Sequence, residues 1–333
     1  MILALNCGSS SLKYASFEGD RRVSGGTVSG IGVPGGHATH AHAVHEALSR
    51  LPPPQAVGHR LVHGGPRLLE PVRIDEPVLR ELRAAVPFAP LHLPAAIGAI
   101  EAVAERHPEV PQVACFDTAF HRTLPEVARR FPLPGRIDDL GVRRYGFHGL
   151  SYEWAVSELT LPARTVIAHL GNGASMCAVR EGVSIDTTMG LTPAGGFMMG
   201  TRSGDLDPGV ILFLLWRMSR EELERLVERE SGLLGVSGTT SDMKALLAST
   251  EPRAKLAVEM FCSQARKAVA AMAAALGGIE ALVFTGGIGE HAAEVRERIC
   301  SGLSWLGRFE VRVIAADEER VIARHVRRLV RTD

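Results

Sequence analysis

The N-terminal segment Asn6–Lys13 combines a turn and side chains that can bind phosphate. It reads Asn-Cys-Gly-Ser-Ser-Ser-Leu-Lys, so a glycine turn with consecutive backbone amides is followed by a lysine. Successive amides of such a turn form a concave anion site, and the lysine adds a cation suited to a phosphate group. The alternative is a serine-rich hairpin without a ligand. On this segment alone, both interpretations stay open.

Two arginines lie beside glycines. Arg60 belongs to the segment His59–Gly65, and Arg202 belongs to Met199–Asp205. Either guanidinium can instead form an ion pair that serves only the fold. Together, two arginines beside glycines are what a carboxylate and a transferring phosphoryl group require. The pair indicates chemistry on small anions.

Asp117 and His148 are the remaining candidates for chemistry. Asp117 follows the predicted strand 113–116, which places it at a carboxyl edge, where ligands bind in α/β folds. Its alternative role is a helix cap, because Asp and Thr both favour that position. His148 lies in Tyr-Gly-Phe-His-Gly. On its own, a histidine between glycines is more typical of a structural residue than of a catalytic one.

Two strand–glycine–strand patterns, one at the head of each half, indicate β-hairpins around small-residue turns. They cover residues 1–17 and 166–179, and a third strand over 281–285 ends at a glycine pair. Helical spacing and a leading proline predict a helix over 94–107. Further helices are predicted over 221–230 and 253–276, followed by a strand over 309–314 and a basic helix over 318–330.

Alternating strands and helices indicate an α/β fold. The repeated hairpin predicts two related domains that face each other with a ligand between them, since glycine turns at strand ends let a phosphate approach the backbone. A length of 333 residues suits two domains with separate cores. We expect the boundary near Leu150.

The composition excludes several classes of partner. Lys and Arg total 37 and Asp and Glu total 37, so the chain carries no electrostatic footprint for nucleic acid or an anionic membrane. The longest strongly apolar run, 210–216, is far shorter than the roughly 20 residues of a membrane span, and no signal peptide is indicated. Five scattered cysteines without a Cys-x-x-Cys spacing predict reduced thiols. We expect a cytoplasmic protein.

The chain resembles the acetate kinase family over essentially its full length. The resemblance is specific because many motifs occur in the family's order. The matching segments are NCGSSSLK (6–13), GHRLVHGG (58–65), APLH (89–92), FDTAFH (116–121), RYGFHG (144–149), HLGNGAS (169–175), DTTMGLTP (186–193), MMGTRSGDLDPG (198–209), SGLLGVSGTTSDMK (231–244), GGIGE (286–290) and DEERVIAR (317–324).

The resemblance implies the fold of the sugar kinase, Hsp70 and actin superfamily, a two-domain clamshell of duplicated ribonuclease H-like domains. Residues 1–150 would form the acyl-substrate domain, with the C-terminal helix 318–330 packed back on it. Residues 151–333 would form the nucleotide-binding domain. The implied state is a homodimer.

The resemblance also implies a role for each site residue. Asp117 would be the family's catalytic carboxylate, and His148 and Arg202 would stabilise the transition state. Arg60 would bind the acyl substrate, with Val62, Leu91, Phe147 and Pro193 around its methyl group. Asn6 and Glu318 would help hold Mg²⁺. The nucleotide would be bound by Lys13, His169, Leu170, Gly171, Asn172, Gly173, Asp242, Met243, Lys244, Gly286, Gly287, Ile288, Gly289 and Glu290.

The implied reaction is the reversible transfer of the γ-phosphoryl group of ATP to acetate, giving acetyl phosphate and ADP. The implied metal cofactor is Mg²⁺, and Mn²⁺ is the alternative. The acceptor is a carboxylate with a reference pKa of about 4, so it is ionised at neutral pH and needs no base. We therefore expect Asp117 to orient Mg²⁺ or water rather than to abstract a proton. The alternatives are a propionate or butyrate kinase and a catalytically weak nucleotide-binding relative.

The segment between Tyr14 and Gly58 is shorter than in typical family members, and it carries His37, His40, His42 and His45. Their spacing can place several imidazoles on one helical face, as a metal site does. We favour a solvated helix. A further departure is Lys244, which stands where the family usually has arginine.

Overall fold

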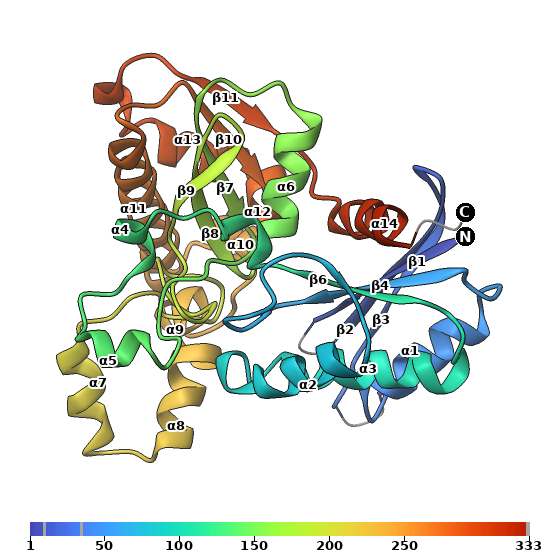
Figure 1. The fold of residues 1–333 in the computed structure, drawn as a ribbon. Helices are drawn as coiled ribbons and strands as arrows, with labels where there is room; N and C mark the ends of the chain where they lie inside the picture. Colours follow the sequence, from blue (N-terminus) through green and yellow to red (C-terminus); the bar gives the residue numbers. More distant parts are fainter. Residues whose placement is uncertain (9–10, 34–35, 331–333) are drawn as a thin grey trace. The chain divides into compact units, whose positions relative to one another are not determined.

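The computed structural model describes residues 1–8, 11–33 and 36–330. The chain folds into two compact units (Figure 1). The first unit comprises Met1–Arg122 and Asp317–Asp333, and the second comprises Thr123–Ala316. Among the described residues, no helix has both the length and the apolar character needed to cross a membrane.

The first unit is built on a mixed sheet. Within the described residues its strand order is β3-β2-β1-β4-β6-β5. The strands β1, β2 and β3 form an antiparallel meander, β4 and β6 continue parallel to β1, and β5 pairs antiparallel with β6. The bounds are β1 (Ile2–Cys7), β2 (Ser11–Glu18), β3 (Arg21–Ser29), β4 (Ala56–Leu61), β5 (Val72–Arg73) and β6 (Gln112–Phe116).

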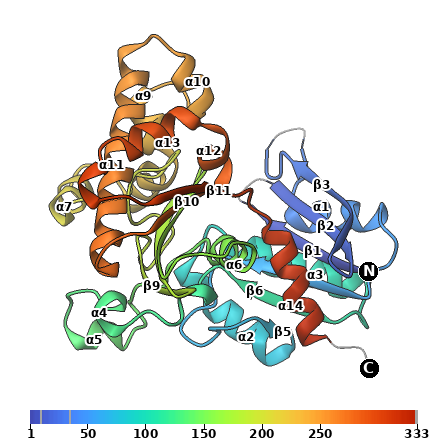
Figure 2. The same ribbon diagram turned by 90° about the horizontal axis from the view of Figure 1, so that it is seen from above.

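Helices cover both faces of this sheet, and neighbouring residues of β4 show which helix lies on which face. A Cβ atom on Gly58 would lie 2.3 Å from Ile322 of α14 (Glu318–Leu329). The next residue, His59, points to the opposite face and bonds to Gln112, which donates to the carbonyl of Ile100 in α3 (Leu93–Arg106). Figure 2 shows α14 lying across the strands. The remaining helices are α1 (His40–Ser49), α2 (Glu76–Ala84) and the 3₁₀ turns Val86–Phe88 and Ala119–His121.

The second unit repeats this plan. Its strand order is β11-β10-β7-β8-β9 within the described chain. The strands β7, β8 and β9 form an antiparallel meander, and β10 and β11 continue parallel to β7. The bounds are β7 (Arg164–Leu170), β8 (Ala174–Arg180), β9 (Val183–Thr187), β10 (Ala281–Thr285) and β11 (Glu310–Val313). The meander followed by two parallel strands occurs in both units, which confirms the expectation of two related domains.

The longest helix of the second unit, α11 (Pro252–Leu276), packs on β7, β8 and β9. It begins at a proline and ends where Gly277 adopts a left-handed conformation with φ of 71°, as helix termini commonly do. The other helical elements are α4 (Glu126–Arg129), α5 (Gly135–Asp138), α6 (Gly149–Glu158), α7 (Pro208–Leu215), α8 (Arg220–Arg225), a π-helix (Leu226–Glu230), α9 (Gly232–Ser237), α10 (Met243–Ala248), α12 (Gly286–His291), α13 (Ala293–Cys300) and the 3₁₀ turn Ser304–Leu306.

The boundary between the units falls after Arg122 rather than near Leu150, and the chain returns to the first unit at Asp317. Residues 123–150 belong with the second sheet because their polar groups bond to it. The Arg144 guanidinium donates to the carbonyls of Thr187, Thr188 and Met189. These bonds join residues about forty positions apart, so local sequence patterns do not predict them.

The histidine-rich segment forms α1, which buries Ala43, Val44, Ala47 and Leu48 and packs against α3. It is therefore an amphipathic helix of the first core rather than a fully solvated one. His37 pairs with Glu46, and the His40 ring bonds to the carbonyl oxygen of Gly8 at 2.8 Å. Within the described ranges, no three His, Cys, Asp or Glu side chains come together as a metal cluster.

Candidate active site

The carboxyl ends of three parallel strands bring Asn6, Arg60 and Asp117 together. In the register of the sheet Asn6 lies opposite Arg60, and the Asp117 amide donates to the carbonyl oxygen of Leu61 at 3.0 Å. Parallel strands end at one edge of a sheet, so polar residues that follow them meet there. The three residues were predicted from the sequence, and the structure assembles them within the first unit.

Arg60 and Asp117 form a bidentate ion pair. Arg60 Nε donates to Asp117 Oδ1 at 2.9 Å and Nη2 donates to Oδ2 at 2.5 Å, while Nη1 donates to Asn6 Oδ1 at 3.1 Å. The Asp117 side chain is only 1% exposed. Burial disfavours the guanidinium charge, but the Asp117 and Glu318 carboxylates outweigh burial and raise the pKa of Arg60 above its ordinary value. Arg60 is therefore a fixed, permanently charged group.

The first turn of α14 adds two carboxylates to this cluster. Asn6 Nδ2 donates to Glu318 Oε2 and to Glu319 Oε1, each at 3.1 Å, and Glu318 Oε2 lies 3.6 Å from Arg60 Nε. Three carboxylates thus surround one guanidinium. Mg²⁺ in kinase sites is usually held by one or two carboxylates, with phosphate oxygens and water completing its shell. The oxygens of Asn6 and Glu318, with the surplus negative charge, fit such an ion.

Lys13 lies directly opposite Asn6 in the β1–β2 hairpin. Opposed residues of an antiparallel pair project from the same face, so Lys13 lies on the face of Asn6. Its side chain is exposed. In the preceding turn, the Gly8 amide donates to the carbonyl oxygen of Ser11 at 2.8 Å. Ser9 and Ser10, which the predicted anion site also uses, lie outside the described residues.

In the second unit, His148 and Arg202 meet at Gly173. A Cβ atom on Gly173 would lie 3.1 Å from His148 Nε2 and 3.3 Å from Arg202 Nη1, so the missing side chain makes room for both groups. Arg202 Nη1 also donates to the carbonyl oxygen of Pro193 at 3.3 Å. Two cationic or hydrogen-bonding side chains thus reach the same glycine turn.

The His148 ring is held from two sides. Its Nδ1 bonds to Ser175 Oγ at 2.8 Å, and Ser175 also bonds to the Tyr152 hydroxyl. Its face stacks on the His169 ring, with centroids 4.2 Å apart and an interplanar angle of 19°. His169 Nδ1 in turn bonds to Ser151 Oγ at 2.9 Å. These contacts leave His148 Nε2 directed at Gly173.

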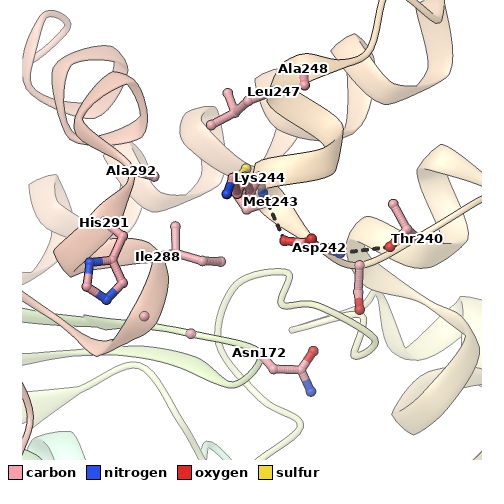
Figure 3. A pocket seen from close by; sticks show the side chains of 13 residues that line it. Asn172, Thr240, Asp242, Met243, Lys244, Leu247, Ala248, Ile288, His291 and Ala292 are labelled. Carbon is pink, nitrogen blue, oxygen red and sulfur yellow. Dashed lines mark hydrogen bonds between the residues drawn. The ribbon is translucent and has the colours of Figure 1, made fainter.

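The second unit also contains a cavity of about 930 Å³, shown in Figure 3. Seven residues predicted to bind nucleotide line it: Gly171, Asn172, Asp242, Met243, Lys244, Gly287 and Ile288. Asp242 caps α10 by accepting the Lys244 amide at 3.0 Å, and its own amide donates to Thr240 Oγ1 at 3.1 Å (Figure 3). The cap fixes the start of α10 at the cavity wall.

The cavity has further lining residues that the sequence interpretation missed, namely Thr240, Ser241, Leu247, Ala248, His291 and Ala292. Leu247 and Ala248 lie one helical turn beyond Met243 and Lys244, so helical spacing would have indicated them. His291 directly follows the Gly286–Glu290 motif. Apolar side chains and backbone glycines thus surround much of the cavity.

The other predicted nucleotide residues do not line this cavity. His169 and Leu170 end β7, and Gly173 carries the contact with His148. Gly286 has φ of 77°, and a Cβ atom there would lie 2.8 Å from the Leu170 carbonyl oxygen, so a glycine is required. Gly289 is buried in α12. Glu290 accepts the Ala316 amide at 3.0 Å.

The four residues predicted to contact the acyl methyl group are divided between the units. Val62 follows β4 and is buried, and Leu91 precedes α3 and is half-buried. Both belong to the first unit. Phe147 is 1% exposed and Pro193 is buried, and both belong to the second unit. Each unit therefore contains two of the four residues.

Comparison with known proteins agrees with this architecture. The structure of a ROK hexokinase from Thermus thermophilus shares the fold at a TM-score of 0.50 and 14% identity, covering 98% of this chain and 96% of that chain. Two sheets that each contain an antiparallel meander followed by two parallel strands are characteristic of the duplicated fold of actin and the sugar kinases. Within that class, the sequence profile of the Acetokinase family matches residues 36–330, and the chain belongs to this family.

Individual relatives are close. An acetate kinase of Rhodopseudomonas palustris is 44% identical, covering 99% of this chain and 98% of the relative. The alignment runs over 394 positions although this chain has 333 residues, so the relative is the longer protein. The structure of a propionate kinase from Francisella tularensis matches at a TM-score of 0.94 with 34% identity and covers 99% of both chains.

Proposed function

We propose that the protein is an acetate kinase that transfers the γ-phosphoryl group of ATP reversibly to acetate, giving acetyl phosphate and ADP. Family membership supports this reaction class. The observation that carries it is the turn Gly171–Gly173. Its first two residues line the 930 Å³ cavity, and its third receives His148 Nε2 and Arg202 Nη1. A nucleotide in the cavity would thus have its phosphates at the cations.

The chemistry follows from the charges. In the proposed step an acetate oxygen forms a bond to the γ-phosphorus, and the bond to the bridging oxygen of ADP breaks. The transition state is loose and anionic, so positioned cations supply most of the catalysis. We assign transition-state stabilisation to Arg202 and His148, and acetate binding to Arg60. Asp117 holds Arg60 by two bonds, and the already ionised nucleophile requires no base.

We assign Mg²⁺ to Asn6 and Glu318, with Mn²⁺ as a possible substitute. When bound, the ion would neutralise charge on the nucleotide phosphates. Lys13, on the same face of the hairpin as Asn6, is assigned to those phosphates. We assign acyl binding to the first unit and nucleotide binding to the second. The proposed nucleotide contacts in the second unit are His169, Leu170, Asp242–Lys244 and Gly286–Glu290.

The length of the acyl chain determines which carboxylic acid is the preferred acceptor. Val62, Leu91, Phe147 and Pro193 are assigned to the acyl group. The propionate kinase structure matched above favours propionate as the alternative acceptor. One methylene in an apolar pocket changes the discrimination by only about 1–3 kcal/mol, so both acids are expected to react at different rates. A nucleotide-binding relative without turnover is disfavoured by the presence of Arg60, Asp117, His148 and Arg202.

A hydroxylamine trapping assay tests the proposed function. With Mg²⁺, ATP and millimolar acetate, propionate or butyrate, acyl phosphate should accumulate as the hydroxamate, with acetate at least comparable to propionate. The folded state is verified in the same sample by circular dichroism. If no C2 to C4 acid gives product above the enzyme-free control, the protein is not a carboxylate kinase.

We further propose that the protein is a cytoplasmic homodimer. The helix α7 buries none of its side chains, and its residues Leu212 and Phe213 are 64% and 55% exposed; Trp216, directly after the helix, is 88% exposed. Large exposed apolar side chains on one short segment favour an interaction surface, so we assign this segment to contact with a second copy. Four of the five free cysteines are buried, which suits a reducing compartment.

A further inference from the structure

Arg202 has an acidic neighbour that none of the sequence motifs includes. Glu228 Oε2 lies 3.4 Å from Arg202 Nε, and the two side chains are 16% and 19% exposed. Glu228 belongs to the five-residue π-helix Leu226–Glu230, which follows directly on α8. Such short π segments interrupt regular helices and are frequent at functional sites. The pair therefore connects an unusual backbone element to a proposed catalytic residue.

The backbone of the π-helix is bonded to the segment that carries Arg202. Thr201 Oγ1 donates to the Glu228 carbonyl oxygen at 3.1 Å, and the Ser203 amide donates to the Val227 carbonyl oxygen at 3.1 Å. The Ser231 amide donates to the Thr201 carbonyl oxygen at 3.0 Å. The last carbonyls of a helix need partners outside it, and here residues on both sides of Arg202 supply them. Glu228 is thereby fixed relative to the Arg202 backbone.

The contact with Glu228 is made at one edge of the Arg202 guanidinium. Glu228 faces Nε, while Nη1 donates to the Pro193 carbonyl oxygen and lies at Gly173 beside His148. A guanidinium is planar, so contacts at Nε and at Nη1 together define the orientation of the whole group. The Nη edge then points to the glycine turn that borders the nucleotide cavity.

We propose that Glu228 is a positioning residue that holds Arg202 with its Nη edge toward Gly173 and His148, where the transferring phosphoryl group is assigned. The inference rests on the proposed function, because it is the rate of the proposed phosphoryl transfer that depends on Glu228. In this proposal Glu228 is not assigned to contact with substrate or metal. It acts through the orientation of Arg202.

The positioning role of Glu228 predicts how the difference in kcat between the wild type and Glu228→Gln depends on pH. Burial raises the pKa of Glu228 above its ordinary value, Arg202 and Arg229 oppose this rise, and Glu224 adds to it. The carboxylate therefore takes up its proton at a higher pH than an exposed glutamate. Once protonated, Glu228 no longer attracts Arg202 by charge. The advantage of the wild type over Glu228→Gln should shrink as the pH falls through this pKa.

The experiment compares Glu228→Gln with Glu230→Gln as a matched control. Glu230 lies in the same π-helix, but its side chain is 48% exposed and pairs with Arg225. Loss of a charged partner at a buried site is worth on the order of tenfold in rate. We expect kcat of Glu228→Gln to fall about tenfold with little change in the KM for ATP, and Glu230→Gln to retain nearly full activity. Glu228→Asp should recover part of the loss.

A double-mutant cycle separates positioning from a general effect on folding. If Glu228 acts through Arg202, then Glu228→Gln should cost nothing further in an Arg202→Ala background. An equal loss in both backgrounds, or wild-type kcat in Glu228→Gln, overturns the inference. Equal thermal unfolding midpoints for Glu228→Gln and Glu230→Gln exclude a difference in stability.

A readout independent of turnover distinguishes this inference from the proposed function. The Arg202 Nε–H resonance can be assigned by its loss in Arg202→Lys, and its hydrogen exchange should be slow in the wild type and faster in Glu228→Gln. If the wild type phosphorylates no acid but this difference is present, the proposed function fails and the positioning contact stands. If exchange is the same in both proteins, the positioning contact is wrong.

Discussion

The guanidinium of Arg60 and the carboxylate of Asp117 face each other edge to edge, with Nε–Oδ1 at 2.9 Å and Nη2–Oδ2 at 2.5 Å. Asp117 is almost fully buried, so its charge is directed at Arg60 rather than at bulk water. We propose from this contact that Asp117 orients Arg60. A general base is not required, because the proposed nucleophile is already ionised.

The first prediction concerns Asp117→Asn. The amide can accept only one of the two Arg60 bonds, so Arg60 loses its orientation; kcat should fall by a factor on the order of 10² and the KM for acetate should rise. Between about pH 6 and 8, the pH–rate profile of Asp117→Asn should keep the shape of the wild-type profile, with kcat lower by the same factor throughout. A limb present in the wild type and absent from Asp117→Asn would instead support proton transfer. Arg60→Ala serves as the comparison, because it should raise the same KM.

The second prediction concerns Arg202→Ala. The charge of Arg202 matters most when charge spreads over the transferring group, so kcat should fall by a factor on the order of 10²–10³ while ATP affinity changes little. Isothermal titration with ATP and steady-state kinetics on the same preparation measure the two effects. Arg21→Ala is a suitable control, because that arginine is 73% exposed and pairs with Glu18. Near wild-type kcat in Arg202→Ala would refute the assignment.

The third prediction concerns Ser175, which bonds to His148 Nδ1 at 2.8 Å. Ser175→Ala removes this bond while Gly173 and Arg202 stay in place, so His148 loses its orientation and kcat should fall on the order of tenfold. Nitrogen NMR of the His148 ring should show a changed tautomer population. Ser175→Thr keeps the hydroxyl and should restore the wild-type spectrum. An unaltered spectrum in Ser175→Ala would show that the hydroxyl does not orient the ring.

The fourth prediction concerns the homodimer. Phe213→Glu places a charge on the apolar surface of α7, and burying an unpaired charge at an interface is costly, so the variant should be monomeric. Light scattering after size-exclusion chromatography measures the mass. Val127→Glu is the matched control, since Val127 is 90% exposed on α4. If both variants keep the wild-type mass, α7 is not the dimer contact.

The fifth prediction concerns acid stability. Burial lowers the pKa of His59 from 6.5 to about 4, although its bond to Gln112 opposes the shift. Because the folded pKa is depressed, the unfolded chain binds the proton first, and stability falls as the pH drops from about 6.5 toward 4. The shift corresponds to a loss of at most about 3–4 kcal/mol. Urea unfolding at pH 7 and pH 4.5 should show a smaller acid loss for His59→Gln, and an equal loss in both proteins would exclude His59 as its source.

Much of the fold followed from local patterns. The two hairpins, the long helix over 252–276 and the terminal strand and helix were all recognisable because glycine turns, apolar alternation and helical spacing act over a few residues. The placement of Asp117 also followed, because residues after parallel strands share one sheet edge. The predicted helix over 221–230 divides into α8 and a π-helix, a backbone choice stabilised by bonds to the Arg202 segment.

The roles assigned to the individual site residues remain predictions, but their grouping can be compared with the structure. The sequence by itself determined the family, the duplicated α/β architecture and the residue types required for phosphoryl transfer, since motif order and local periodicity are written along the chain. Only the tertiary structure decided the boundary at Arg122, the stack of His148 on His169 and the contact of Glu228 with Arg202. These depend on bonds between residues far apart in sequence, and no local pattern specifies which distant partner a buried polar group will find.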